Sequence, residues 1–211
     1  MNQPTELIAS VVDMVFPLTG RSLPPEYALP LQQALRAELP WLGEEPRAGV
    51  HPVKLAHGSG AQALLSGRSR LLLRLPRERV EAAGALAGRT LAVGDCPVRL
   101  GTPHLRELLP HGTLYAHAVA ARNEDEADFV QWVAAELAAL QLRAPWICGK
   151  RGGRRLPEQT VTTFSLMVHN LPPAESLRLQ EQGLGAHRLL GCGIFVPHKT
   201  TAAVGEDFYV A

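Results

Sequence analysis

Four glycines are concentrated in the stretch GLGAHRLLGCGIFVP, residues 183–197, which runs into an apolar segment near the C-terminus. Glycine loses the most conformational freedom on folding, so such a cluster marks backbone that adopts positive φ or approaches another group closely. A dinucleotide fingerprint would need a glycine where Arg188 stands, and a P-loop would need a lysine where Ile194 stands. The spacing that remains is G-x-G-x5-G-x-G, between a predicted helix and a predicted strand.

The sequence around this loop predicts a strand, a helix, two strands, a helix and a strand, in that order. The first of these helices is the clearest in the chain, because its apolar residues recur every three or four positions and its first turn is acidic. The predicted elements cover residues 113–121, 125–142, 144–171 (two strands), 172–183 and 193–198.

The first half of the chain shows the same order of elements. We expect its first strand to end at Pro17. Its predicted elements are a strand at 7–18, a helix at 24–42, short strands within 49–67, a strand at 69–76, a helix at 77–88 and a hairpin at 89–101. The predicted fold class is therefore α+β, a tandem of two ferredoxin-like (RRM-like) βαββαβ halves, with the glycine-rich loop in the C-terminal one. We place the two domains at residues 1–108 and 109–211.

Composition narrows the class of protein. The chain has 211 residues, 46% of them hydrophobic, with a formal net charge of +1. Its three cysteines are odd in number and widely spaced, which favours a reducing compartment and predicts no metal site. No stretch approaches the roughly 20 apolar residues of a membrane span, and the N-terminus has no basic leader. We therefore expect a cytoplasmic protein that needs neither a membrane nor a cofactor.

Charge is distributed less evenly than the total suggests. Residues 146–199 contain seven basic and three acidic residues, and four of the basic ones lie within GKRGGRR, at a predicted turn between two strands. A basic hairpin suits the phosphates of an RNA stem, which proteins recognise mainly by shape. The alternative is an ordinary solvated loop.

The loop GLGAHRLLGCGIFVP, together with VVDMVFPLTGRSLP, GVHPVK, RSRLLLRLP and ESLRLQEQGLGAHR, resembles the CRISPR-associated repeat-RNA endoribonucleases, the sixth Cas family. The likeness is to the short members of the myxobacterial-type subtype within type I. It implies metal-independent cleavage of CRISPR precursor RNA within its repeats, which leaves 2′,3′-cyclic phosphate and 5′-hydroxyl ends on mature crRNA. It also implies that the protein stays bound to its product, and that other Cas subunits of an effector complex are further candidate partners.

This chemistry needs a base for the 2′-hydroxyl proton and positive charge beside the phosphate, and histidine suits the first role because its pKa lies near neutrality. The family draws its histidine from the first helix or just after it, which makes His51 the candidate here. Lys54 is a candidate for stabilising charge, and His57 is the alternative histidine. By sequence alone, an ordinary turn residue before Pro52 is the better interpretation of His51, and it is the family resemblance that favours the catalytic one.

The remaining candidates are predicted to contact RNA. Small residues let backbone N–H groups approach phosphates or base edges, and basic side chains add charge. These candidates are Arg68, Arg70, Lys150, Arg151, Arg154, Arg155, Gly183, Gly185, His187, Arg188, Gly191 and Gly193. Two alternatives stay open: a subunit of the same fold that binds repeat RNA without cutting it, and an unrelated two-domain interaction protein whose glycines are structural.

Overall fold

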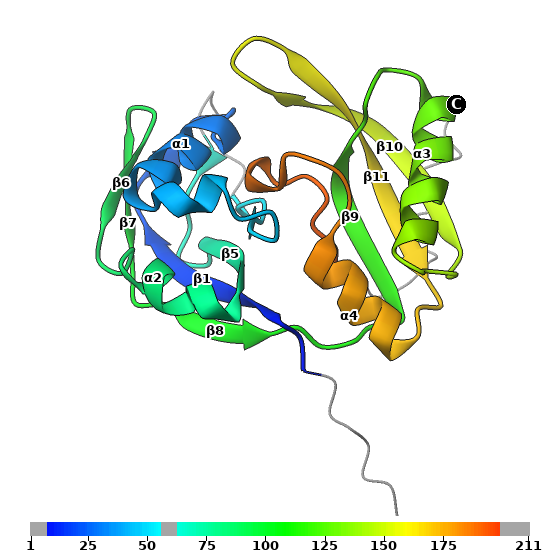
Figure 1. Ribbon diagram of the computed structural model, residues 1–211. Coiled ribbons are helices and arrows are strands. Elements are labelled where there is room, and N and C mark those ends of the chain that lie inside the picture. Colours follow the sequence, from blue (N-terminus) through cyan, green and yellow to red (C-terminus); the bar gives the residue numbers. More distant parts are fainter. Residues whose placement is uncertain (1–7, 56–62, 199–211) are drawn as a thin grey trace, which may run out of the picture.

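The computed structural model of the protein describes residues 8–55 and 63–198, which form two main antiparallel sheets with helices packed on one face of each (Figure 1). The first sheet has the order β3-β5-β1-β7-β6, and β8 pairs with β1 beyond the end of β7. The elements of this half are β1 (Val11–Thr19), β2 (Ser22–Leu23), α1 (Ala28–Glu38), η1 (Pro40–Gly43), β3 (Gly49–Val50), β4 (Ala63–Leu64), β5 (Arg70–Pro76), η2 (Arg77–Arg79), α2 (Val80–Gly84), β6 (Thr90–Val93), β7 (Cys96–Leu100) and β8 (His104–Glu107).

The second sheet has the order β10-β11-β9-β12. Its half consists of β9 (Thr113–Ala120), α3 (Glu126–Ala139), β10 (Trp146–Arg155), β11 (Thr160–His169), α4 (Pro173–Gln182), η3 (Arg188–Leu190) and β12 (Val196–Pro197). In the second half the first strand, β9, lies between β11 and β12, and in the first half β1 lies between β5 on one side and β7 and β8 on the other, which is the ferredoxin-like placement of the first strand. The predicted tandem α+β fold is confirmed.

Local sequence explains why α3 begins and packs where it does. The Asp125 carboxylate accepts hydrogen bonds from the N–H groups of Ala127 (2.7 Å) and Asp128 (3.0 Å), which caps the first turn. Phe129 and Val133 follow at helical spacing and are buried against the second sheet. The N-cap and the apolar stripe therefore both favour a helix in this segment.

Two predicted boundaries are wrong. Pro17 does not end β1, because its carbonyl still accepts a hydrogen bond from the Gly101 N–H (2.8 Å) and the Leu18 N–H donates to Ser69 (3.2 Å). The basic segment GKRGGRR is not a turn either. It belongs to β10, whose ladder with β11 absorbs an irregularity between Cys148 and Arg151, and the chain turns only at 156–159.

Each half has its own hydrophobic core. The larger cluster takes its residues from the first half, and the second main cluster takes its residues from the second half. A small cluster of Ala9, Val11, Leu108 and Leu177 joins the two. These separate cores support residues 1–108 and 109–211 as the proposed domains. Within the described residues, no helix is long and apolar enough to cross a membrane.

Candidate active site and nucleic-acid interface

The glycine-rich loop, residues 183–195, lies between the two halves of the molecule (Figure 1). Its two ends cross in direct contact: the Leu184 N–H donates to the Gly193 carbonyl (3.1 Å), and the Gly193 N–H donates to Ala118 in β9 (2.7 Å). A Cβ on Gly193 would lie 2.0 Å from the Leu184 oxygen, and one on Gly183 would lie 2.3 Å from the Gly193 oxygen. Both residues also have positive φ. The fold itself therefore requires these two glycines.

The other two glycines also have protein neighbours. A Cβ on Gly185 would approach the Trp132 ring at 3.0 Å, and one on Gly191 would lie 3.4 Å from both Pro52 and the Val50 carbonyl. Gly191 borders a small pocket described below. The predicted approach of glycine backbone to RNA therefore finds its support at Gly191, whereas the crossing of the loop accounts for Gly183 and Gly193.

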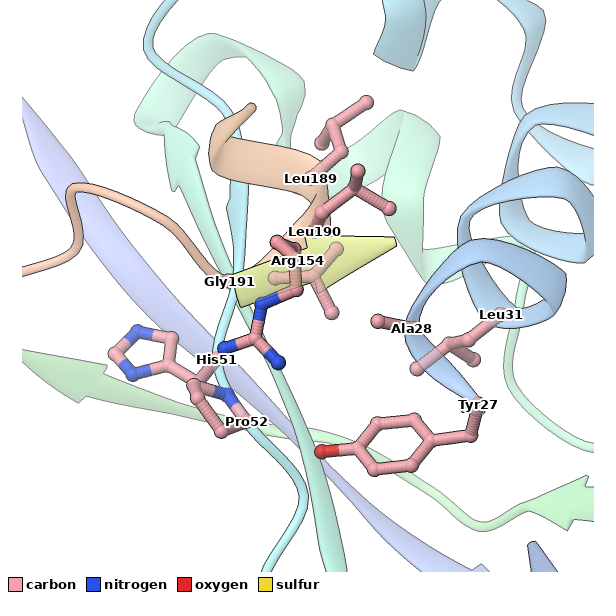
Figure 2. A pocket seen from close by; sticks show the side chains of 10 residues that line it. Tyr27, Ala28, Leu31, His51, Pro52, Arg154, Leu189, Leu190 and Gly191 are labelled. Carbon is pink, nitrogen blue, oxygen red and sulfur yellow. The ribbon is translucent and has the colours of Figure 1, made fainter. Parts of the chain in front are cut away.

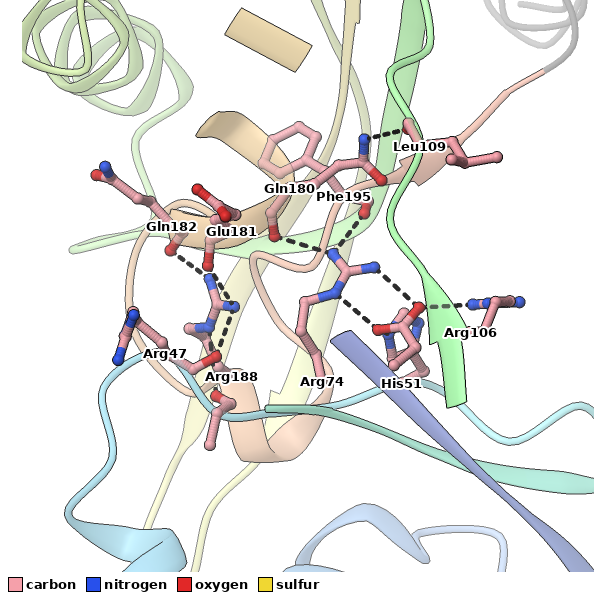
Figure 3. Close-up of polar contacts among 12 residues, drawn as sticks. Arg47, His51, Arg74, Arg106, Leu109, Gln180, Glu181, Gln182, Arg188 and Phe195 are labelled. Atoms are coloured by element: carbon pink, nitrogen blue, oxygen red, sulfur yellow. Dashed lines mark hydrogen bonds and ion pairs between the residues drawn. The ribbon is translucent and has the colours of Figure 1, made fainter. Parts of the chain in front are cut away.

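Arg188 is buried within this loop and surrounded by carbonyl groups (Figure 3). Its guanidinium donates to Ala48 (3.3 Å) and Arg47 (3.2 Å) in the first half, and to Glu181 (3.3 Å) and Gln182 at the end of α4. Burial lowers its pKa to about 10, so the group stays charged at neutral pH. A cation at the carboxyl end of a helix is stabilising. This placement favours a structural role for Arg188 over the predicted RNA contact.

His51 is also buried, and its partner is an acidic residue that the sequence analysis did not select. The imidazole Nε2 lies 3.1 Å from Oδ1 of Asp13, which lies near the start of β1. Arg74, in β5, donates to the same carboxylate through Nε (2.9 Å) and Nη2 (3.2 Å), and Arg106 donates through Nη2 (2.7 Å). The Asp13 carboxylate thus contacts three basic side chains, those of His51, Arg74 and Arg106, which Figure 3 labels.

Arg74 extends this network across the boundary between the halves. Its Nη1 donates to the carbonyls of Gln180 in α4 (3.0 Å) and Phe195 after the glycine-rich loop (2.8 Å). A buried charge is tolerated only when it is paired and hydrogen-bonded. The carboxylate, the guanidinium and the imidazole satisfy one another, and together they fix the second half against the segment that carries His51.

Burial controls the protonation of this network. It lowers the pKa of His51 from its ordinary value, an effect that the Asp13 charge opposes only in part, so the imidazole is neutral at pH 7. Burial alone would raise the pKa of Asp13, but His51 and Arg74 outweigh it and hold that pKa far below its usual range. A neutral imidazole beside a permanent carboxylate has the protonation state that a general base requires.

A pocket lies next to His51, where residues of both halves meet (Figure 2). The Tyr27 hydroxyl accepts a hydrogen bond from the Val53 N–H (2.8 Å), which anchors the segment that carries His51, and burial raises the pKa of this phenol. Arg154 enters the pocket from β10, and in Figure 2 it lies between Tyr27 and the His51 imidazole. The lining residues are Tyr27, Ala28, Leu31, Val50, His51, Pro52, Arg154, Leu189, Leu190 and Gly191.

The other predicted basic residues of β10 point elsewhere. Lys150, Arg151 and Arg155 are exposed, and Arg151 pairs with Glu124 (3.1 Å). Because side chains alternate along a strand, Arg154 lies on the face opposite to its neighbours Gly153 and Arg155. The hairpin of β10 and β11 therefore presents exposed charge on its surface and a single arginine to the pocket.

The remaining candidates are scattered around this region. Lys54 is exposed, and its charge helps to lower the pKa of His117 on β9, which burial lowers most. Arg68 is exposed, while Arg70 donates to the backbone of Gly67 (2.9 Å) and Ser69 (2.8 Å). His187, half-buried, has positive φ before η3, and His57 lies outside the described residues.

Sequence reasoning missed Asp13 and Arg74, although a signal for both is present. Each is a lone charge in an otherwise apolar strand, VVDMVF and LLLRLP. A charge at a buried strand position must find a partner, so the two strands could have been paired through them. Among the described residues, no group of three or more His, Cys, Asp or Glu side chains is arranged to hold a metal ion.

Comparisons with known proteins converge on one family. A family model described as Cas6 Crispr matches residues 12–200. The CRISPR-associated endonuclease Cas6 of Myxococcus xanthus is 35% identical over 194 residues, which cover 92% of this chain and 84% of that protein.

Solved structures of low sequence identity share the fold. A CRISPR associated protein Cas6 superposes with a TM-score of 0.63 at 11% identity, over 90% of this chain and 100% of that chain. Thermus thermophilus Cse3, bound to an RNA representing a pre-cleavage complex, gives a TM-score of 0.51 at 15% identity, over 89% of this chain and 98% of that one.

Proposed function

Because the chain belongs to the Cas6 family, we propose that it is a metal-independent endoribonuclease that cleaves CRISPR precursor RNA within its repeats. The products would be crRNAs with 2′,3′-cyclic phosphate and 5′-hydroxyl ends. The relative from Myxococcus xanthus, which is named an endonuclease, supports the activity.

The observation that carries this proposal is the His51–Asp13 pair. If Nε2 carries the proton and donates it to Asp13, then Nδ1 keeps its lone pair and can accept the proton of a 2′-hydroxyl. The same logic applies wherever a buried carboxylate fixes the tautomer of a catalytic histidine. Arg74 compensates the Asp13 charge by donating to both carboxylate oxygens, and it shares Oδ1 with the imidazole.

The surface around the pocket supports RNA binding. Lys54 is exposed close to the site, and the exposed charges of β10 project from the second half. Contacts to phosphates outside the scissile position survive cleavage, so we expect the protein to stay bound to its product. Other Cas subunits are further proposed partners.

One assay tests the proposal. The pure protein is incubated in excess over its host's repeat RNA, with EDTA, and the products are examined for 2′,3′-cyclic phosphate and 5′-hydroxyl ends. We expect cleavage at one position, and no cleavage of a matched RNA with a single 2′-deoxy substitution at the scissile nucleotide. Binding without cleavage of the unmodified RNA would instead identify a repeat-RNA-binding subunit.

A further inference from the structure

Unlike the other basic residues of its hairpin, Arg154 directs its side chain into a pocket. Lys150, Arg151 and Arg155 are exposed, whereas Arg154 is half-buried and lines the pocket beside His51 and Tyr27. It belongs to the second half, while His51 and Tyr27 belong to the first. The packing of the two halves therefore places a guanidinium in the same pocket as the candidate general base.

The charge of Arg154 is poorly balanced by the protein. Its Nε is buried without a hydrogen-bond partner, and no ion pair to this residue is found in the part of the chain that the structure describes. The thiol of Cys192, whose pKa burial raises, hydrogen-bonds to the guanidinium, but a neutral thiol is a weak acceptor and brings no charge. By contrast, Arg74 has two carboxylate oxygens and two carbonyls.

A buried donor without an acceptor is unfavourable, and native proteins retain very few of them. An arginine in this condition, directed into a pocket, fits an anionic ligand. The planar fork of a guanidinium matches the two oxygens of a phosphate better than any other side chain does. The neighbouring base candidate, His51, then indicates which phosphate of a bound RNA would lie there.

We propose that Arg154 is a catalytic residue that binds the non-bridging oxygens of the scissile phosphate, an inference that rests on the proposed function. In the reaction the 2′-oxygen gives its proton to His51 and bonds to phosphorus, and the bond from phosphorus to the 5′-oxygen breaks. The 5′-oxygen takes a proton from water and leaves as a hydroxyl. Arg154 stabilises the charge that develops on the non-bridging oxygens, where preorganised donors are most effective.

The test compares Arg154→Ala with Arg155→Ala, its neighbour on the same strand, under single-turnover conditions with saturating protein. We expect Arg154→Ala to slow cleavage by about 10²- to 10³-fold, the usual loss for a donor of this kind. Arg155→Ala should weaken RNA binding and slow the saturated rate at least tenfold less than Arg154→Ala does.

Two further measurements separate catalysis from folding. Added guanidinium ion should restore cleavage by Arg154→Ala but not by His51→Ala. Arg154→Lys, which keeps the charge but lacks the fork, should melt like the wild type and still cleave at least tenfold more slowly; it decides the matter if Arg154→Ala does not fold.

The outcomes distinguish a failure of the inference about Arg154 from a failure of the proposed function. If the wild type cleaves and Arg154→Lys and Arg154→Ala cleave as fast, the inference is overturned and the proposed function stands. If the wild type leaves repeat RNA intact, the proposed function is overturned, and this inference with it.

Discussion

The two halves have related folds but place different kinds of charged groups around the site. The first half buries Asp13, Arg74 and His51 in one hydrogen-bonded network. The second half exposes Lys150, Arg151 and Arg155 on a long hairpin. A proton-transfer group needs a fixed tautomer and a defined pKa, which burial provides, whereas phosphate contacts need charges that adapt to a flexible ligand.

Removing the base should give the largest effect. We expect His51→Ala to slow single-turnover cleavage by roughly 10²- to 10⁴-fold, the range for general acid–base catalysis, while the affinity for repeat RNA changes little. Quenched-flow cleavage and filter binding measure the two quantities. Cleavage at the wild-type rate would show that another residue is the general base. It would also contradict the separation of chemistry in the first half from RNA binding in the second.

Substitutions at two glycines of the loop between the halves should destabilise the protein to different extents. Both have positive φ, but a Cβ would lie 2.0 Å from a carbonyl oxygen at Gly193 and 3.4 Å from its nearest neighbours at Gly191. Gly191→Ala should cost about 1–2 kcal/mol, the price of a left-handed L-residue. Gly193→Ala should cost clearly more, because backbone must also move. Urea unfolding measures both, and equal losses would show that the crossing does not matter.

Neutralising the exposed hairpin should change the response to salt. Replacing Lys150, Arg151 and Arg155 together by alanine should flatten the log–log dependence of RNA affinity on salt by up to about two to three units, at about 0.7 to 0.9 per phosphate contact. Arg99→Ala, an exposed arginine of the first half, is the control. An unchanged slope would show that the hairpin is an ordinary solvated segment that does not contact RNA phosphates.

The pH dependence should show the smallest but most specific effect. Burial lowers the pKa of His51, so its neutral, base-competent form persists as the pH falls. The acid limb of the saturated cleavage rate should therefore lie below the ordinary histidine pKa of about 6.5. Because Asp13 raises this pKa, Asp13→Asn should move the limb lower still and reduce the plateau. An acid limb above 6.5 contradicts the assignment, provided that the variants melt as folded proteins.

The sequence allowed the fold to be predicted well and the site only in part. Helical periodicity and the acidic first turn of the helix predicted at 125–142 are local signals, so they could be read from the sequence. The crossing of Gly183 with Gly193, the burial of Arg188 and the entry of Arg154 into the pocket all depend on how the halves pack. Such contacts join residues distant in the chain, and spacing alone does not reveal them.

The first half should carry out the chemistry and the second half should bind RNA. One measurement tests this separation, a single-turnover cleavage titration over a range of protein concentrations. Each titration gives a saturated rate and a half-saturating concentration. We expect His51→Ala to lower the saturated rate and to keep the half-saturating concentration. The triple hairpin variant should raise that concentration while its saturated rate changes little. If both variants lose rate and affinity in the same proportion, chemistry and binding are not separated between the two halves.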